Sequence, residues 1–193
     1  MNDTKVSQKK NMYKIIVLIG EAGSGKDSLM QGVLQENPNL HEIVSYTTRP
    51  PREGEIDGIN YNFISGEKFG DKVVNGEMIE AACFNGWFYG TGYASLRSDC
   101  INIGVFNPTG VESLLAAQNV EILVFYVRAS DKERLLRQLN REENPDVMEI
   151  IRRFKTDMID FEHLDFDYIE LENNRLDDFD RNVAIITAKA ANF

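Results

Sequence analysis

A glycine-rich stretch that ends in a lysine is the part of this sequence best suited to chemistry. Residues 20–26 read Gly-Glu-Ala-Gly-Ser-Gly-Lys, after an aliphatic run at residues 14–19 and before a helical pattern that starts at Lys26. Glycines let backbone N–H groups converge on phosphate oxygens, and the helix N-terminus and the lysine add positive charge. This strand-to-helix setting is the one that a phosphate-binding loop requires. The residues predicted to contact ATP here are Gly20, Glu21, Ala22, Gly23, Ser24, Gly25, Lys26, Asp27 and Ser28.

The residue after the lysine departs from the usual phosphate-loop pattern. Asp27 stands where a serine or threonine commonly places a hydroxyl on Mg²⁺, and Ser28 follows it. Asp27 could bind the metal directly or through water, or it could be a helix-start carboxylate worth about 0.3–1 kcal/mol against the helix dipole. No predicted strand ends in the acidic residue that often completes such a site. Mg²⁺ is the predicted cofactor, with Asp27 and Ser28 as candidate ligands.

Arginine side chains gather in two segments of a chain whose net charge is −10. Nucleic-acid binding relies on a broad positive face, so no nucleic-acid partner is expected. An anionic ligand therefore needs the local clusters. These are Arg49 and Arg52 in the first segment, and Arg134, Arg137, Arg141, Arg152 and Arg153 in the second.

The segments around these side chains alternate between strand and helix patterns. Further apolar runs, typical of strands, lie at residues 43–46, 101–106, 122–127 and 168–171. A helix is predicted from residue 26 to about residue 35, and capping-box patterns predict helix starts at Thr109 and Ser130. This alternation predicts a parallel sheet. Residues 47–92 carry short strand-like pieces between glycines instead, which predicts an inserted subdomain.

The length and composition suit one compact domain. At 193 residues the chain can bury roughly two-thirds or more of its unfolded surface. No apolar run approaches the ~18 residues that span a bilayer, so a soluble protein without a membrane partner is expected. Residues 1–12 are polar and predict a disordered arm without a secretory signal. Cys83 and Cys100 are too few for a disulfide framework; we expect packed thiols and a cytoplasmic location.

Residues 45–63 closely resemble the acceptor-binding signature of guanylate kinases. They read Ser-Tyr-Thr-Thr-Arg-Pro-Pro-Arg-Glu-Gly-Glu-Ile-Asp-Gly-Ile-Asn-Tyr-Asn-Phe. The resemblance extends over nearly the whole chain after Met12. Its parts follow in order: the phosphate loop, this signature, Ile79-Glu80, Phe88-Tyr89-Gly90, the arginine-rich helices and Asn173.

This resemblance implies an α/β fold of the P-loop NTPase class, with a parallel sheet flanked by helices. The implied guanylate-kinase-like domain covers residues 13–193. Its core would comprise residues 13–46, 93–136 and 154–193, its inserted subdomain for the nucleoside monophosphate residues 47–92, and its helical lid residues 137–153. Residues 141–146 are polar and predict the tip of that lid.

The resemblance also implies which residues contact the acceptor. The family residues that hold the acceptor phosphate match Arg49, Arg52, Tyr61 and Tyr89, and those that hold guanine match Ser45, Glu80 and Thr91. Guanidinium and phenol groups suit phosphate oxygens. An ionised Glu80 only accepts hydrogen bonds, and guanine offers two adjacent donors where adenine offers an acceptor at N1. A carboxylate on an exposed strand face is the alternative for Glu80.

The lid residues follow from the same resemblance. Arg137 and Arg141 are four residues apart, which predicts that they share a helix face, and they resemble the arginines that guanylate kinases bring onto the phosphates of ATP. Arg153 resembles the third, with Arg152 as the alternative. Solvated arginines are the alternative. Asn173 resembles the residue beside the adenine of ATP, with a turn asparagine as the alternative. Lys26, Arg137, Arg141 and Arg153 are thus the predicted catalytic residues.

One segment departs from the family pattern. Residues 105–110 read Val-Phe-Asn-Pro-Thr-Gly, where guanylate kinases usually carry Asp-Ile-Asp-x-Gln-Gly. Val105 and Asn107 thus replace two aspartates that the family uses near the acceptor nucleoside and the metal, and Asn107 keeps a hydrogen-bonding side chain in the predicted acceptor site. The departure leaves open a rearranged metal site, weak activity or a different acceptor.

The expected function is phosphoryl transfer from ATP to GMP or dGMP, which yields ADP and the diphosphate. The alternatives are a kinase for another nucleoside or deoxynucleoside monophosphate, a catalytically weak nucleotide-binding module, and a P-loop hydrolase. A hydrolase would have no use for an acceptor-phosphate cluster such as Arg49, Arg52 and Tyr61. The oligomeric state is left open.

Overall fold

The computed structural model describes residues 12–52, 54–84, 86–141 and 143–193. Of the arm predicted at residues 1–12, only Met12 lies within the described residues. Glu142 of the predicted lid tip lies outside them. Among the described residues, no helix is both long enough and apolar enough to cross a membrane.

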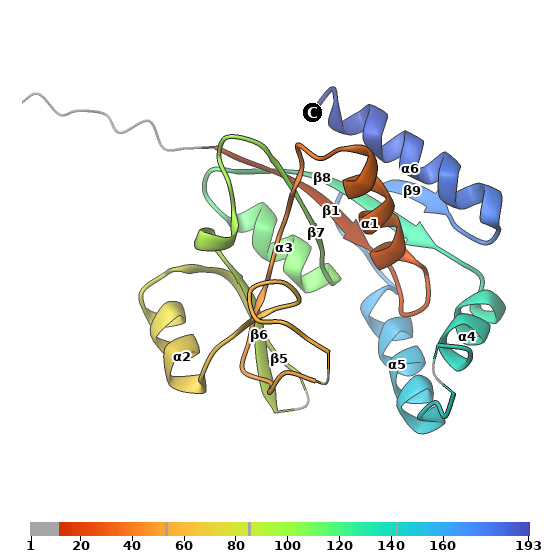
Figure 1. Cartoon of the computed structure of the whole chain (residues 1–193), viewed down its shortest axis with the longest axis horizontal. Coiled ribbons are helices and arrows are strands. Elements are labelled where there is room, and N and C mark those ends of the chain that lie inside the picture. Colours follow the sequence, from red (N-terminus) through yellow and green to blue (C-terminus); the bar gives the residue numbers. More distant parts are fainter. Residues whose placement is uncertain (1–11, 53, 85, 142) are drawn as a thin grey trace, which may run out of the picture.

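A parallel sheet forms the centre of the molecule, as the alternating pattern predicts (Figure 1). Its strands are β1 (Tyr13–Ile19), β2 (His41–Glu42), β7 (Ile101–Val105), β8 (Val120–Arg128) and β9 (Ile169–Glu172), in the spatial order β2-β7-β1-β8-β9. Ile16 of β1 lies opposite Ile103 of β7 and Leu123 of β8. Residues 15–19 have no exposed surface, which explains why β1 is aliphatic throughout.

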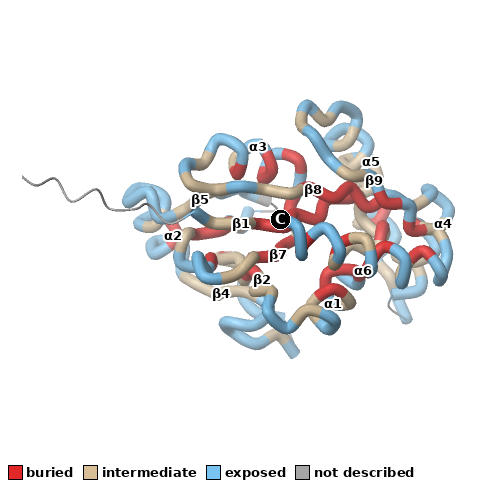
Figure 2. The backbone as a smooth tube through the Cα atoms, turned by 90° about the horizontal axis from the view of Figure 1, so that it is seen from above, coloured by how far each residue is buried: buried red, intermediate tan, exposed pale blue. Residues whose placement is uncertain are grey.

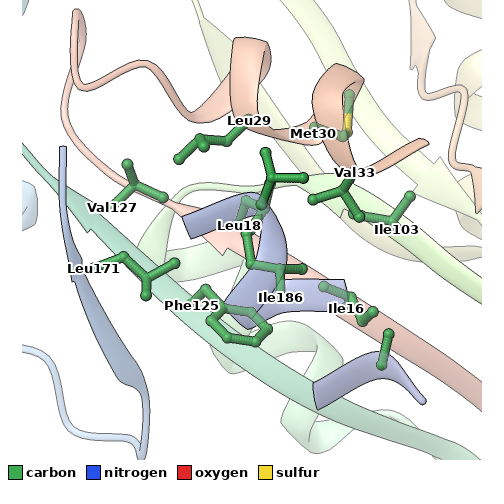
Figure 3. Packing of buried hydrophobic residues seen from close by; sticks show 12 residues of the cluster. Ile16, Leu18, Leu29, Met30, Val33, Ile103, Phe125, Val127, Leu171 and Ile186 are labelled. Atoms are coloured by element: carbon green, nitrogen blue, oxygen red, sulfur yellow. The ribbon is translucent and has the colours of Figure 1, made fainter. Parts of the chain in front are cut away.

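Helices cover both faces of this sheet (Figure 2). α1 (Lys26–Glu36) and α6 (Leu176–Ala190) lie on one face, and α3 (Pro108–Ala116) lies on the other. The cluster between β1, α1 and α6 includes Ile16, Leu18, Leu29, Val33 and Ile186 (Figure 3). On the opposite face, alternate residues of β1 pack against α3. Each large apolar side chain buried here contributes about 1.5–3 kcal/mol, so the core fixes β1 and the loop that leaves its carboxyl end.

α4 (Asp131–Leu139) and α5 (Val147–Asp160) form a helical hairpin after β8 (Figure 1). The helix start predicted at Ser130 is confirmed, because its hydroxyl accepts a hydrogen bond from the Glu133 N–H at 3.3 Å. The prediction that Arg137 and Arg141 share a helix face is wrong. α4 ends at Leu139, and the Arg141 N–H reaches the Gln138 carbonyl only in the following turn, at 3.4 Å.

A smaller subdomain is inserted between β2 and β7. Its sheet consists of β3 (Tyr46–Thr47), β4 (Asn62–Phe63), β5 (Met78–Phe84) and β6 (Trp87–Gly92), in the order β4-β3-β6-β5. The sequence patterns did not predict α2 (Gly66–Val74), whose N-terminus is capped by the Ser65 hydroxyl. Phe69 of α2 is buried and stacks on Phe88 of β6, with ring centroids 5.5 Å apart. The 3₁₀ turn η1 (Tyr93–Ser95) leads back to the central sheet.

Three further local predictions are corrected. The run at residues 43–46 is not one strand: β2 ends before it, and only its last residue enters β3. The N-cap of α3 is Asn107, two residues before Thr109, because the Asn107 side chain accepts a hydrogen bond from the Gly110 N–H at 2.8 Å, so the helix begins at Pro108. Cys83 is not a packed thiol but an exposed one on β5, whereas Cys100 is half-buried.

Candidate active site

The loop between β1 and α1 has the backbone of an anion-binding loop. Gly23 and Gly25 adopt left-handed φ values of +82° and +91°. A Cβ at Gly25 would lie 2.5 Å from the Asn173 amide nitrogen, so a side chain there would be strained both by the left-handed backbone and by this contact. The first intrahelical bond of α1 runs from the Leu29 N–H to the Gly25 carbonyl at 3.0 Å. The N–H groups before Leu29 at the start of α1 are therefore left for a ligand.

A cavity of about 430 Å³, named the phosphate cavity here, lies over this loop. Ala22, Gly23, Gly25, Lys26, Asp27 and Ser28 line it from the loop side, and Arg137, Gln138, Arg141 and Arg153 line it from the α4–α5 hairpin. The positively charged side chains outnumber the one carboxylate, so the cavity favours a multiply charged anion. Six of the nine predicted loop residues and the three predicted lid arginines thus border one space, whereas Gly20, Glu21 and Ser24 do not line it.

Arg137 and Asn173 connect the hairpin, the loop and β9. The Arg137 guanidinium donates to the carbonyls of Gly23 at 3.3 Å, Ser24 at 3.1 Å and Asn173 at 2.7 Å. The Asn173 amide donates to the Ser24 carbonyl at 2.8 Å, and the residue is only 5% exposed. Asn173 also borders a neighbouring cavity of about 370 Å³, together with Arg175, Leu176 and Phe179. The asparagine is therefore more than a surface turn residue.

The predicted acceptor-phosphate side chains gather in the inserted subdomain. Arg49 lies over the ring of Tyr61 at 5.7 Å, and the rings of Tyr61 and Tyr89 are 6.0 Å apart. Glu55, which sequence reasoning did not single out, accepts a hydrogen bond from Arg49 at 2.8 Å, and this bond raises the pKa of Arg49 above its ordinary value. Arg52 is exposed, and its backbone N–H bonds to Glu55 at 2.6 Å. Glu55 therefore holds both arginine positions.

The predicted guanine-binding side chains also lie together. Glu80 of β5 pairs across the sheet with Thr91 of β6, and the Thr91 hydroxyl lies 3.2 Å from that of Ser45. Burial raises the pKa of Glu80 above its ordinary value, and hydrogen bonds from Thr91 offset part of that rise. Glu80 is half-buried, which does not fit the alternative of a carboxylate on an exposed strand face.

A further cavity of about 460 Å³, named the transfer cavity here, joins the phosphate loop to the acceptor side. Gly20, Ala22 and Lys26 line it from the loop, Tyr61 from the insert, Val105, Phe106 and Asn107 from the end of β7, and Arg152, Arg153, Thr156, Asp157, Asp160 and Phe161 from α5 and the residue after it. Lys26 and Arg153 border this cavity and the 430 Å³ cavity alike. A phosphoryl group bound over the loop would thus face an acceptor bound beside Tyr61.

A family model described as guanylate kinase matches residues 12–189. The chain belongs to the guanylate kinase family. A guanylate kinase of Gloeobacter violaceus is 35% identical over 146 residues, which cover 74% of this chain and 70% of that protein. A guanylate kinase of a Nostoc strain is 49% identical over 78 residues, so the match spans 40% of this chain and 39% of that relative. The crystal structure of guanylate kinase from Anaplasma phagocytophilum has a TM-score of 0.68 at 24% identity over 94% of this chain and 88% of that one, which shows the fold.

Arg152 and Arg153 of α5 are both bound to one carboxylate of the same helix. Arg153 donates to Glu149 at 2.9 Å, and Arg152 makes two bonds to the same carboxylate, at 2.6 Å and 2.9 Å. These bonds, chiefly those from Arg152, lower the pKa of Glu149 to about 2. Glu149 therefore stays ionised at neutral pH and competes with any phosphate for Arg153.

Among the described residues, the ligands for Mg²⁺ would have to come from side chains that are not clustered as a metal site. Across the described ranges, no group of three or more His, Cys, Asp and Glu side chains is arranged to hold a metal. Mg²⁺ needs less, because it commonly keeps several waters and binds through one or two carboxylates and the substrate phosphates. Asp27 fits that requirement: its side chain is 78% exposed, lies 3.7 Å from the Lys26 ammonium and borders the phosphate cavity.

Asn107 has a structural role at one of the two positions where the family aspartates are replaced. Its side chain caps α3, so Asn107→Ala should destabilise the protein by about 0.5–2 kcal/mol. Asn107→Asp keeps an oxygen in the same place and should keep the stability. Urea denaturation of the three proteins measures the difference. Equal stability of the alanine variant and the wild type would show that the cap contributes nothing.

Proposed function

We propose that this chain transfers the γ-phosphoryl group of ATP to GMP or dGMP, as an ATP-dependent nucleoside monophosphate kinase. The observation that carries the proposal is the 460 Å³ cavity, which Lys26, Tyr61 and Arg153 border together. It connects a phosphate-binding loop with an acceptor site, and that connection is what separates a kinase from a hydrolase or a simple binding protein.

On the donor side, we assign the ATP phosphates to the loop at residues 20–28. The N–H groups at the start of α1 and the Lys26 ammonium supply positive charge where the β- and γ-phosphates would lie. The adenine is assigned to the neighbouring 370 Å³ cavity beside Asn173. Asn173 contributes by holding the Ser24 carbonyl, and Arg175 and Phe179 offer a guanidinium and an aromatic ring to a base in that cavity.

On the acceptor side, we assign the monophosphate to Arg49, Arg52, Tyr61 and Tyr89, and the guanine to Ser45, Glu80 and Thr91. The Arg49–Glu55 ion pair fixes the guanidinium before substrate arrives, which reduces the ordering that binding requires. Glu80 would accept hydrogen bonds from the N1–H and the 2-amino group of guanine. Because its carboxylate is partly desolvated in the free protein, those two donors would replace solvation that it lacks.

During transfer, Lys26, Arg137, Arg141 and Arg153 would neutralise the charge that spreads over the phosphoryl oxygens. Arg153 would exchange Glu149 for a phosphate, since it now bonds to that carboxylate. Mg²⁺, bound with ATP, would offset the charge of the phosphates. Asp27, with Ser28 beside it, is the proposed protein side of that site. Movement of the hairpin toward the insert would exclude water from the reaction.

The proposed subdomains, partners and location follow from these assignments. The core would comprise residues 13–46, 93–136 and 154–193, the acceptor-binding insert residues 47–92, and the lid residues 137–153. ATP and GMP or dGMP would be the partners, with neither nucleic acid nor membrane involved, and the cytoplasm the location. Another nucleoside monophosphate remains the second candidate acceptor, because Val105 and Asn107 border the transfer cavity where carboxylates would otherwise lie.

A panel of acceptors tests the proposal. With Mg²⁺ and ATP, the purified protein should form ADP rapidly with GMP or dGMP, and at least about 10²-fold more slowly with AMP, dAMP, CMP, UMP or dTMP. ADP formation is measured at equal acceptor concentrations. A stronger response to one of the other monophosphates would move the assignment to that acceptor. If no acceptor raised ADP formation above background while GMP still bound, the chain would be a nucleotide-binding module.

A further inference from the structure

The tip of the phosphate loop is held by side chains from both helices of the α4–α5 hairpin. The Ala22 N–H donates to the Asp157 carboxylate of α5 at 2.8 Å. The Ala22 carbonyl accepts from Arg134 of α4 at 3.2 Å and from Gln138 at 3.3 Å. A single loop residue is therefore fixed at both of its peptide groups by elements more than 100 positions away in the sequence.

Arg134 and Asp157 also bond to each other beneath the loop. Their charged groups are 2.8 Å apart, and the side chains are only 3% and 15% exposed. The Arg134 guanidinium lies over the Phe154 ring at 4.3 Å and has Glu21 of the loop 3.7 Å away. A buried ion pair of this kind is weak evidence for stability, because a well-packed apolar pair of similar volume is often at least as stable. What an apolar pair could not provide is the set of directional bonds to Ala22.

The position of this pair along the two helices relates it to the lid arginines. Arg137 follows Arg134 by three residues on α4, and Arg153 precedes Asp157 by four on α5, so each arginine lies one turn from the pair. Figure 1 shows α4 and α5 side by side next to the loop before α1. Arg137 and Arg153 both border the phosphate cavity.

We propose that Arg134 and Asp157 are positioning residues for the phosphoryl donor. Asp157 also borders the 460 Å³ cavity, but its Oδ2 accepts from Ala22 and Arg134, so the pair acts through the loop tip and the lid arginines rather than by touching ATP. They hold the loop tip and the base of the hairpin in register before the nucleotide binds, so that ATP meets a site already ordered. Without this preorganisation, the free-energy cost of ordering the loop and the hairpin would weaken ATP binding and raise the barrier to phosphoryl transfer. The inference rests on the ATP site proposed above.

Three variants separate this role from a purely structural one. Asp157→Asn keeps the shape of the side chain and removes the charge that Arg134 faces. The double variant R134M/D157L removes both charges of the pair, so neither is left buried without the other, while Glu21 loses its contact with Arg134. Asp131→Asn is the matched control: Asp131 also bonds to Arg134, at 2.9 Å, but its side chain is 84% exposed and belongs to α4 itself. Each protein is assayed well below its own Tm.

The measurements are the dissociation constant for ATP and the KM values for ATP and GMP. D157N and R134M/D157L should each weaken ATP binding and raise the KM for ATP by about tenfold or more, with the KM for GMP within about twofold of the wild type. D131N should match the wild type in all three. If the double variant handles ATP like the wild type while the wild type binds ATP, the pair is merely structural and the inference is wrong. If the wild type itself fails to bind ATP, both the proposed function and this inference are wrong.

Discussion

Replacing Lys26 with methionine should lower kcat for GMP phosphorylation by about 10²–10³-fold and leave the fold intact. The lysine borders both the cavity over the phosphate loop and the transfer cavity, where the proposed reaction would spread charge over the phosphoryl oxygens. A preorganised positive charge in such a site is worth more than in water, because the surrounding protein does not need to reorient during the reaction. Methionine preserves the length of the side chain and removes the charge.

A second lysine-to-methionine variant provides the control for this prediction. Lys132→Met removes the same charge from an exposed position on α4 and should leave kcat unchanged. Circular dichroism and Tm, measured on all three proteins, would show whether K26M remains folded. A folded K26M variant that retains more than about one-tenth of the wild-type kcat would contradict the role given to Lys26.

Replacing Glu80 with glutamine should reduce the preference for GMP over AMP, expressed as the ratio of kcat/KM values, by about 10²-fold. In the proposed site an ionised Glu80 would accept both donors of guanine, whereas glutamine presents one acceptor and one donor. A buried donor left without its partner costs roughly 1–3 kcal/mol, which corresponds to this loss. Glu77→Gln, three residues earlier and exposed, is the matched control and should keep the preference.

The pH dependence of acceptor binding gives an independent readout of the same residue. Burial raises the pKa of Glu80 in the free protein, so the group protonates at a higher pH than an exposed glutamate. In the proposed site the ionised form would bind guanine, and protonation would replace one acceptor with a donor. The KM for GMP should therefore rise as the pH falls from neutrality toward the raised pKa, and E80Q should lack this rise. Parallel profiles for the two proteins would remove Glu80 from the guanine site.

The sequence predicted the parts of the molecule whose signals are local. The buried strand β1, the glycine loop and the start of α1 follow one another along the chain, and the structure has them where the motif places them. The start of α3 was misplaced because Asn107 and Thr109 are both good caps. Pro108, which suits the first position of a helix, favours the asparagine and could have decided between them. α2 was missed because Gly66 and Gly70 weaken its helical pattern.

Tertiary packing determines what the sequence could not reveal. Arg134 and Arg137 are alike in type and three residues apart, yet Arg134 is buried beneath Ala22 and Arg137 borders the phosphate cavity. Asp157 resembled other acidic residues near the end of the chain, and its importance becomes visible only where α5 meets the loop. Glu55 lies within the recognised signature, but no spacing rule says that it holds Arg49.

The terminal phosphoryl group of ATP can be followed directly. ATP labelled at the γ-phosphorus is incubated with the protein and Mg²⁺, with and without GMP, and the products are separated. We expect the label to appear in GDP in the same amount as ADP is formed, with almost no ADP when GMP is omitted. Label that appears as inorganic phosphate at the same rate with or without GMP would contradict phosphoryl transfer to a monophosphate.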